Sequence, residues 1–436
     1  MRAVRFSVSG MFRHSAISSG GGVLLALVTW NLGNFLFFVI AGRLLGPTDY
    51  GLVAALLAAT MIVMVPASAL QYAVARGDGG LVALSDAHVG AVYRQALGRS
   101  LWMVPLAGAV VAGMILALPV ADLPRGEMIV TVLIVLPMAP LYLALGQLQA
   151  EQRFGPFSVA TAAIGVPRPV ILLLFTALGM GVYAALGASA VALAAAAGIG
   201  VWFARPQTVR PRPTSEAWGA FRCALPPLVA GLIALSLLTN LDVMVGKLVL
   251  PAQQAGEFAA IAALGKAAVV IPQAVSIVML PRVAARRAQN LDTGPLLAGA
   301  IGLTFIVGAA ATLVAWSIET PIIRLTYGAD YVDGAHLLAP LVGASTLLGG
   351  LMVLLNHHIG RNADSFVWGL TGVAALEAVL LGIFHATPEQ IVMVDAVACA
   401  TGLLLHEVVM GRGPDSMTAG LARLIRTRRR QSPESR

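Results

Sequence analysis

Long apolar stretches separated by short polar segments dominate this sequence. Twelve of them reach the roughly 20 residues that a helix needs to cross a bilayer. They cover residues 20–42, 50–75, 99–120, 128–149, 157–178, 181–203, 222–246, 254–280, 296–318, 334–356, 365–386 and 389–410. Runs of this length predict helices, because barrel strands are shorter and alternate in polarity. We therefore expect an all-α integral membrane protein with about twelve transmembrane helices.

A connector sequence occurs twice along the chain. Residues 43–55 (RLLGPTDYGLVAA) join the first two stretches, and residues 247–260 (KLVLPAQQAGEFAA) join the seventh and eighth. Each copy has a basic residue, a Leu, a Pro four residues after the basic residue, and then a Gly before an Ala pair. Such a repeat predicts a duplicated six-helix unit, and duplicated halves of transporters face each other across a substrate path.

The repeat divides the chain into four parts. Residues 1–204 form the expected N-terminal six-helix lobe and residues 219–410 the C-terminal six-helix lobe. Between them lies a Pro- and Arg-rich linker, 205–218, and residues 411–436 form a basic tail. We expect the linker and the tail to be cytoplasmic, with the tail against anionic lipid head groups.

Composition and charge agree with this topology. Only 11% of the residues are charged, against about 25% in soluble domains. If the N-terminus is inside, 22 of the 28 Lys and Arg residues fall on inner segments and four on outer connections. Cytoplasmic loops carry such an excess of basic residues, so both termini are expected in the cytoplasm.

The sequence lacks the patterns of common catalytic and metal sites. Gly265-Lys266-Ala267 lacks the Ser or Thr and the upstream Gly of a phosphate-binding loop. No cluster of His, Cys and carboxylates has metal-ligand spacing, because the side chains of adjacent His357 and His358 diverge on a helix. The predicted outer loops are too short for a catalytic domain. We therefore expect no enzyme activity, no cofactor and no metal, and no nucleic-acid partner.

Two cations lie near the middle of predicted spans, where charged residues are costly and usually functional. Arg168 stands between Pro167 and Pro169, which should break the helix locally. Lys266 lies in the eighth span, in the other half. One interpretation is that the two line a central cavity and clamp a diphosphate. The alternatives are a kinked structural helix around Arg168 and a salt bridge from Lys266 to Glu377.

Other polar side chains lie on the first and seventh spans, which correspond after duplication. Asn31 and Asn34 share one face of the first span, and Asn240 and Asp242 lie in the seventh. These groups could bind sugar hydroxyls, although interhelical hydrogen bonds are an equally ordinary use. Asp242, and more weakly Asp395 in the last span, are candidates to bind a coupling proton or Na⁺.

Several motifs resemble those of one transporter family. The connector 43–51 after a span with two asparagines looks like the amino-terminal signature of polysaccharide-exporting flippases. Residues 240–248 (NLDVMVGKL) and 255–260 resemble the start of their second half. Leu280-Pro281-Arg282, and residues 325–328 (LTYG) with Tyr331, also match. The chain is thus similar to Wzx-like polysaccharide and oligosaccharide-lipid flippases of the multidrug/oligosaccharidyl-lipid/polysaccharide exporter superfamily.

This resemblance implies a function. Family members open alternately to each side of the bacterial cytoplasmic membrane and move polyprenyl-diphosphate-linked oligosaccharides to the outer leaflet. For such a substrate, we expect Arg168 and Lys266 to contact the diphosphate because of their depth and charge alone, since neither belongs to a family motif. Asn31, Asn34 and Asn240 would be further substrate contacts, with Arg43 and Lys247 gating the exit. Membrane lipids, and glycan polymerases or glycosyltransferases, are the expected partners. The alternatives are an ion-coupled multidrug exporter of the same fold and a non-transporting scaffold for glycan synthesis.

Overall fold

The computed structural model describes residues 11–75, 98, 125–151, 153–205, 215–361, 365–410 and 416. Its α-helices are α1 (Met11–Val63), α2 (Val65–Ala75), α4 (Arg125–Val135), α5 (Met138–Ala150), α6 (Phe154–Gly165), α7 (Pro167–Ala177), α8 (Val182–Ala204), α9 (Ser215–Val249), α10 (Ala252–Gly265), α11 (Val270–Ala288), α12 (Gly294–Ser317), α13 (Glu319–Thr326), α14 (Leu338–Arg361), α15 (Ser365–Ile383) and α16 (Pro388–Leu405). Short 3₁₀ turns η2 (Lys266–Val269), η3 (Ala329–Tyr331) and η4 (Ala335–Leu337) lie between them, and a π-helical turn, η5 (His406–Met410), follows α16.

The predicted spans are confirmed wherever the structure describes them. Ten helical segments in the described ranges are long and apolar enough to cross a membrane. The first, Leu25–Val74, is 50 residues long and contains the first two predicted spans on either side of Gly46, where the backbone turns at φ 72°. The predicted third span, 99–120, lies outside the described residues, as do most of the linker and the tail.

Prolines and 3₁₀ turns divide several spans. The fifth breaks between α6 and α7 at Val166, just before Pro167, because proline has no N–H for the helical ladder and its ring crowds the preceding turn. The eighth contains η2 between α10 and α11. The break at the two prolines was predicted from the sequence, whereas the one at Lys266 was not. Both mid-span cations therefore stand where a helix is interrupted.

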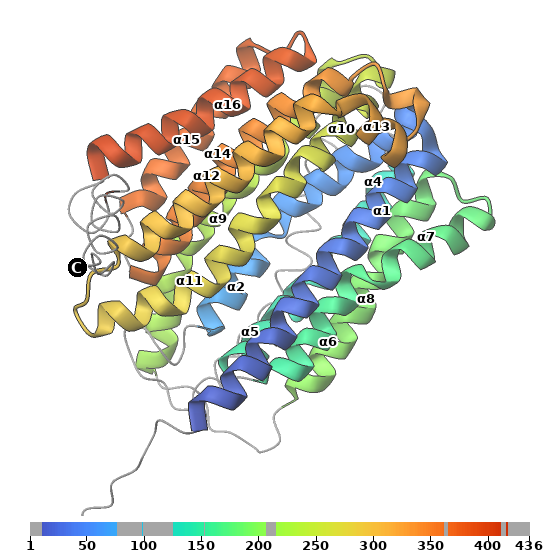
Figure 1. The fold of residues 1–436 in the computed structure, drawn as a ribbon. Helices are drawn as coiled ribbons and strands as arrows, with labels where there is room; N and C mark the ends of the chain where they lie inside the picture. The colour runs from blue at the N-terminus through green and yellow to red at the C-terminus, as the bar shows by residue number, and fades with distance from the viewer. Residues whose placement is uncertain are drawn as a thin grey trace, which may run out of the picture.

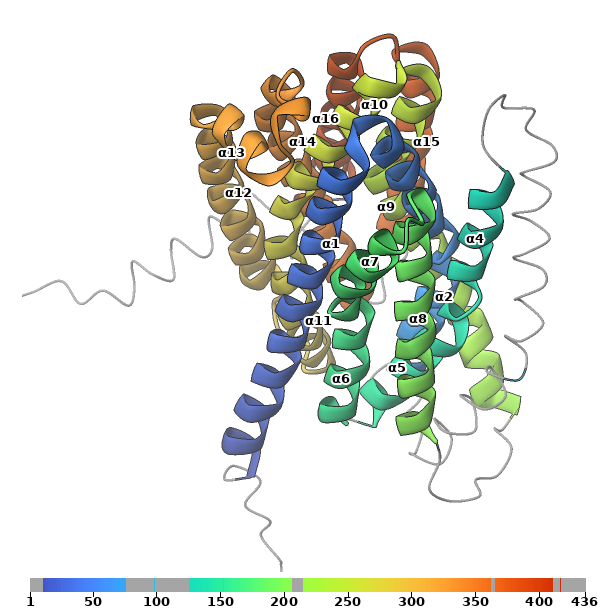
Figure 2. The ribbon, with the colours of Figure 1, turned by 90° about the vertical axis from the view of Figure 1, so that its right-hand side faces the viewer.

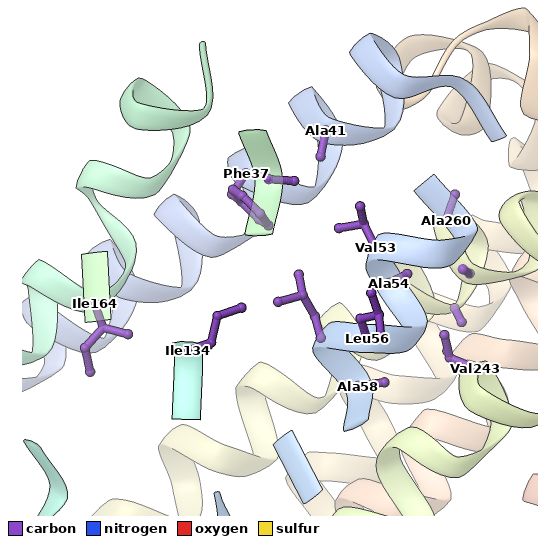
Figure 3. Packing of buried hydrophobic residues seen from close by; sticks show 14 of the residues in the cluster. Phe37, Ala41, Val53, Ala54, Leu56, Ala58, Ile134, Ile164, Val243 and Ala260 are labelled. Atoms are coloured by element: carbon purple, nitrogen blue, oxygen red, sulfur yellow. The ribbon is translucent and has the colours of Figure 1, made fainter. Parts of the chain in front are cut away.

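The helices form two groups, which we call the N lobe (α1–α8) and the C lobe (α9–α16). Figure 1 shows the dark blue first part of α1 and α4–α8 on one side and α9–α16 on the other, with the lighter blue second part of α1 and α2 next to the C lobe. Figure 2 shows the same helices after a quarter turn. The lobes meet where α1 packs on α9 and α10, and where α2 packs on α9. One large apolar core crosses this meeting: Val53 and Ala54 of α1 belong to the same cluster as Val243 and Ala260 of the C lobe (Figure 3).

Candidate functional site

The two copies of the connector pack against each other at one end of the bundle, which we call the connector end. A Cβ atom added to Gly256 would lie 2.8 Å from the Cα of Pro47 and closer still to its carbonyl group. A Cβ at Gly51 would lie 3.0 Å from the backbone nitrogen of Gly256. Glycine is required at both positions because the backbones touch without room for a side chain. The repeat found in the sequence is therefore the contact that joins the lobes.

Side chains reinforce the connector end. Arg43 donates from Nε to the carbonyl oxygen of Thr326 at 2.6 Å and from Nη2 to that of Leu325. Tyr331 donates its hydroxyl to the carbonyl oxygen of Gly42 at 2.7 Å. These bonds join the first connector to the segment after α12. Both segments carry motifs of the family resemblance, and the structure places them in direct contact.

Three tyrosines fill the interior of this contact. The hydroxyls of Tyr50 and Tyr327 lie 3.2 Å apart, and the rings of Tyr327 and Tyr331 have centroids 5.3 Å apart. All three are buried. Burial raises the pKa of both Tyr327 and Tyr331, so the hydroxyls keep their protons and remain hydrogen-bond donors through the physiological range. We call Arg43, the two connector backbones and the three tyrosines the connector seal.

The C lobe holds a cluster of ionisable side chains in its interior. Lys266 at η2 donates from Nζ to Asp242 of α9, with both carboxylate oxygens at 2.8 Å. Asp242 is 1% exposed. Glu377 of α15 and Asp395 of α16, both buried, lie close enough to interact with each other, with Asp242 and with Lys266. The alternative in which Lys266 pairs directly with Glu377 is wrong, because the ammonium group of Lys266 forms its ion pair with Asp242 of α9.

This cluster has more acid than base. Three carboxyl groups face one ammonium in a buried place, and Glu377 and Asp395 lie within hydrogen-bond reach of each other. A buried carboxylate without a partner is strongly unfavourable. The arrangement can therefore take up a proton, and the predicted ion-coupling residues Asp242 and Asp395 lie together in it. Sequence reasoning considered Glu377 only as a partner for Lys266, although a carboxylate in mid-span was the signal.

Arg168 lies inside the N lobe. Its guanidinium donates from Nη1 to the amide oxygen of Asn34 in α1 and from Nη2 to the hydroxyl of Ser189 in α8, the latter at 2.8 Å. The charge centre is 4.0 Å from the ring centroid of Phe37. The side chain is 4% exposed. Neither the contact with Asn34 nor that with Ser189 was predicted from the sequence.

The remaining predicted residues have local partners. Asn31 donates to the carbonyl oxygen of Leu27 and Asn240 to that of Ser236, each at 2.9 Å and each in its own helix. Lys247 lies at the second connector, where Asp49 of the first connector acts on it electrostatically. The side-chain hydrogen bonds of Arg168 lie within the N lobe and that of Lys266 lies within the C lobe. The diphosphate clamp formed by these two cations stays a prediction.

Comparison with known proteins gives the class of the fold. No protein-family model matches the sequence, and no curated protein sequence does. Among solved structures, the eukaryotic MATE transporter AtDTX14 aligns with a TM-score of 0.68 at 14% identity, covering 94% of this chain and 99% of that one. The lipid II flippase MurJ, in an inward closed conformation, aligns with 0.67 at 14% identity over 96% and 94%. The VcmN MATE transporter of Vibrio cholerae aligns with 0.62 at 13% identity over 92% and 100%.

These similarities cover nearly the whole chain and show the fold. The protein is a multi-pass helical membrane protein with the fold of MOP superfamily transporters. Both MATE transporters and a lipid flippase share this fold, and the three alignments have 13–14% identity.

Proposed function

We propose that this chain is an alternating-access flippase that moves a polyprenyl-diphosphate-linked oligosaccharide across the cytoplasmic membrane. The fold supports a transporter, and one of the similar structures is a lipid II flippase. The observation that carries the choice of an anionic lipid is the charge of the N lobe. Among its described residues, the one buried charged side chain is the cation Arg168. A positive charge inside the N lobe attracts a diphosphate and repels the lipophilic cations that many drug exporters carry.

In this proposal the connector seal closes the outer end of the path. The seal joins N-lobe and C-lobe residues through Arg43, Tyr331 and the Gly256 contact, so it must separate before a head group can leave on that side. Arg168 and Lys266 supply positive charge toward the diphosphate, and Asn31, Asn34 and Asn240 are candidate contacts for sugar hydroxyls. The present bonds of these groups lie within each lobe, so they need not break when the lobes separate.

The acidic cluster of the C lobe drives the cycle. Asp242 alternates between its ion pair with Lys266 and an incoming proton or Na⁺, with Glu377 and Asp395 as further acceptors. Neutralising the excess of negative charge changes the packing of α9 against α15 and α16, the helices that carry these groups. Transport should then respond to a gradient of the coupling ion.

The test is a flipping assay in vesicles. The purified chain is reconstituted with a fluorescent polyprenyl-diphosphate oligosaccharide, and an impermeant reductant bleaches the label in the outer leaflet. We expect bleaching of nearly all the label with the wild-type chain and of about half with a chain whose connector end is locked closed by a disulfide between two introduced cysteines. Bleaching of only half with active, folded wild-type protein and an imposed ion gradient would overturn the proposal.

A second candidate, an ion-coupled multidrug exporter, is supported by the acidic cluster and by the similarity to AtDTX14 and VcmN. Efflux of a fluorescent lipophilic cation from the same vesicles, driven by a proton or Na⁺ gradient, would favour it. The same measurement with Asp242→Asn separates coupled efflux from leakage, since the variant should lose the first and keep the second.

A further inference from the structure

The guanidinium of Arg168 is buried without a negative partner. Arginine stays protonated in proteins, and no carboxylate forms an ion pair with it among the described residues. The corresponding cation of the C lobe, Lys266, has Asp242 at 2.8 Å. A full positive charge enclosed in the N lobe therefore lacks the compensation that buried charges require.

The contacts around Arg168 leave only one edge of the guanidinium where a negative group could bind. Nη1 and Nη2 donate to Asn34 and Ser189, and the flat face of the group is covered by Phe37. The Nε–H group is buried and has no acceptor among the described residues. Ser189 in turn donates its hydroxyl hydrogen to the carbonyl oxygen of Ala185 at 2.9 Å. The unpaired donor is thus the Nε edge of the guanidinium.

We propose that the N lobe binds a small inorganic anion at the Nε edge of Arg168. We choose an ion of the size of chloride or bromide because, in this arrangement, the side chain is 4% exposed and the contacts with α1 and α8 enclose the group. The anion neutralises the guanidinium in this closed arrangement and holds α1, α7 and α8 together. The inference meets the proposed function at one point: the anion must leave before Arg168 can supply positive charge toward a diphosphate.

The first test measures the apparent unfolding temperature of the purified full-length chain. Chloride replaces gluconate at constant sodium concentration and ionic strength, and pyrophosphate is titrated in a parallel series. We expect a saturable rise with chloride in the wild type, and a midpoint at least about tenfold higher in Arg168→Gln, since charge-assisted hydrogen bonds are the strong ones. The matched control is Arg205→Gln, which removes an exposed arginine that also lies over an aromatic ring, 4.6 Å from the centroid of Trp202.

The second test needs no variant and covers the case in which Arg168→Gln fails to fold. Bromide replaces chloride in crystals of the wild type, and its anomalous signal is located. A peak within hydrogen-bond distance of Nε supports the proposal. An identical chloride response in wild type and Arg168→Gln would overturn it, and so would a bromide map without a peak there at saturating concentration. If pyrophosphate but not chloride stabilises the chain, and only when Arg168 is present, the proposal of a small anion is overturned and the ligand of the site is a phosphoryl group. None of these outcomes decides whether the chain flips lipid.

Discussion

The contact between Gly256 and Pro47 gives the sharpest prediction. In the Gly256→Ala variant, the added Cβ would lie 2.8 Å from the Cα of Pro47 and closer to its carbonyl group. Backbone atoms cannot rotate away as a side chain can, so α1 and α10 must separate. Overpacking of this kind costs roughly 1–3 kcal/mol. The clash exists only while the connectors touch, so the cost falls on the closed connector end alone. We expect a shift of about 5- to 150-fold toward its open state.

Distances between the lobes measure this shift. Spin labels at Leu178 of the N lobe and Leu325 of the C lobe, both exposed near the connector end, are introduced after replacement of the native cysteines, Cys223 and Cys399. Electron–electron double resonance should show a second, longer distance in Gly256→Ala. The matched control is Gly198→Ala, where a Cβ meets nothing within 4 Å.

Two outcomes would refute the reasoning. The first is a distance distribution in folded Gly256→Ala that equals those of the wild type and Gly198→Ala. The second is loss of folded Gly256→Ala without any longer distance, which would mean that the two backbones touch in every conformation of the chain.

Three further predictions follow from other contacts. Tyr331→Phe removes the buried hydroxyl that donates to Gly42. A lost hydrogen bond costs about 1 kcal/mol, so the same spin labels should show the population with an open connector end rising about fivefold. An unchanged distance distribution would contradict this. Asp242→Asn leaves Lys266 without its carboxylate and should lower the free energy of unfolding by about 3 kcal/mol, as measured by thermal unfolding. The double variant Asp242→Leu, Lys266→Met is the control and should recover stability. Equal stability of Asp242→Asn and the wild type would contradict the prediction. Glu377→Gln removes one proton-accepting group of the acidic cluster and should flatten the pH profile of transport in vesicles, which an unaltered profile would disprove.

The spans and the helix break at Arg168 were predictable because they depend on local sequence. About twenty apolar residues in a row can bury their backbone in lipid only as a helix, and two prolines flanking one residue interrupt that helix whatever surrounds it. The packing of the connectors was only partly predictable. Their repetition was visible in the sequence, but not that one copy would lie upon the other.

The partners within the polar sites could not be predicted from sequence. From the sequence, Lys266 could pair with Asp242, which is 24 residues away on α9, or with Glu377 on α15. The rotation of each helix about its axis decides this, and packing of the whole lobe sets that rotation. Arg43 and its acceptor at Thr326 are 283 residues apart, so only the assembled fold brings them together. Ser189 is one of many hydroxyls in the spans and carries no distinguishing signal.

The turn at Gly46 also determines how the connector end can move. Only this residue has non-helical φ and ψ angles within the 53 residues of α1, so the first two spans are joined without a loop to absorb a change of angle. Any tilt of the first half of α1 therefore also moves Pro47 and the residues after it. Separation at this end must therefore involve two whole spans, and its rate should be that of a rigid-body motion, on the order of microseconds to milliseconds.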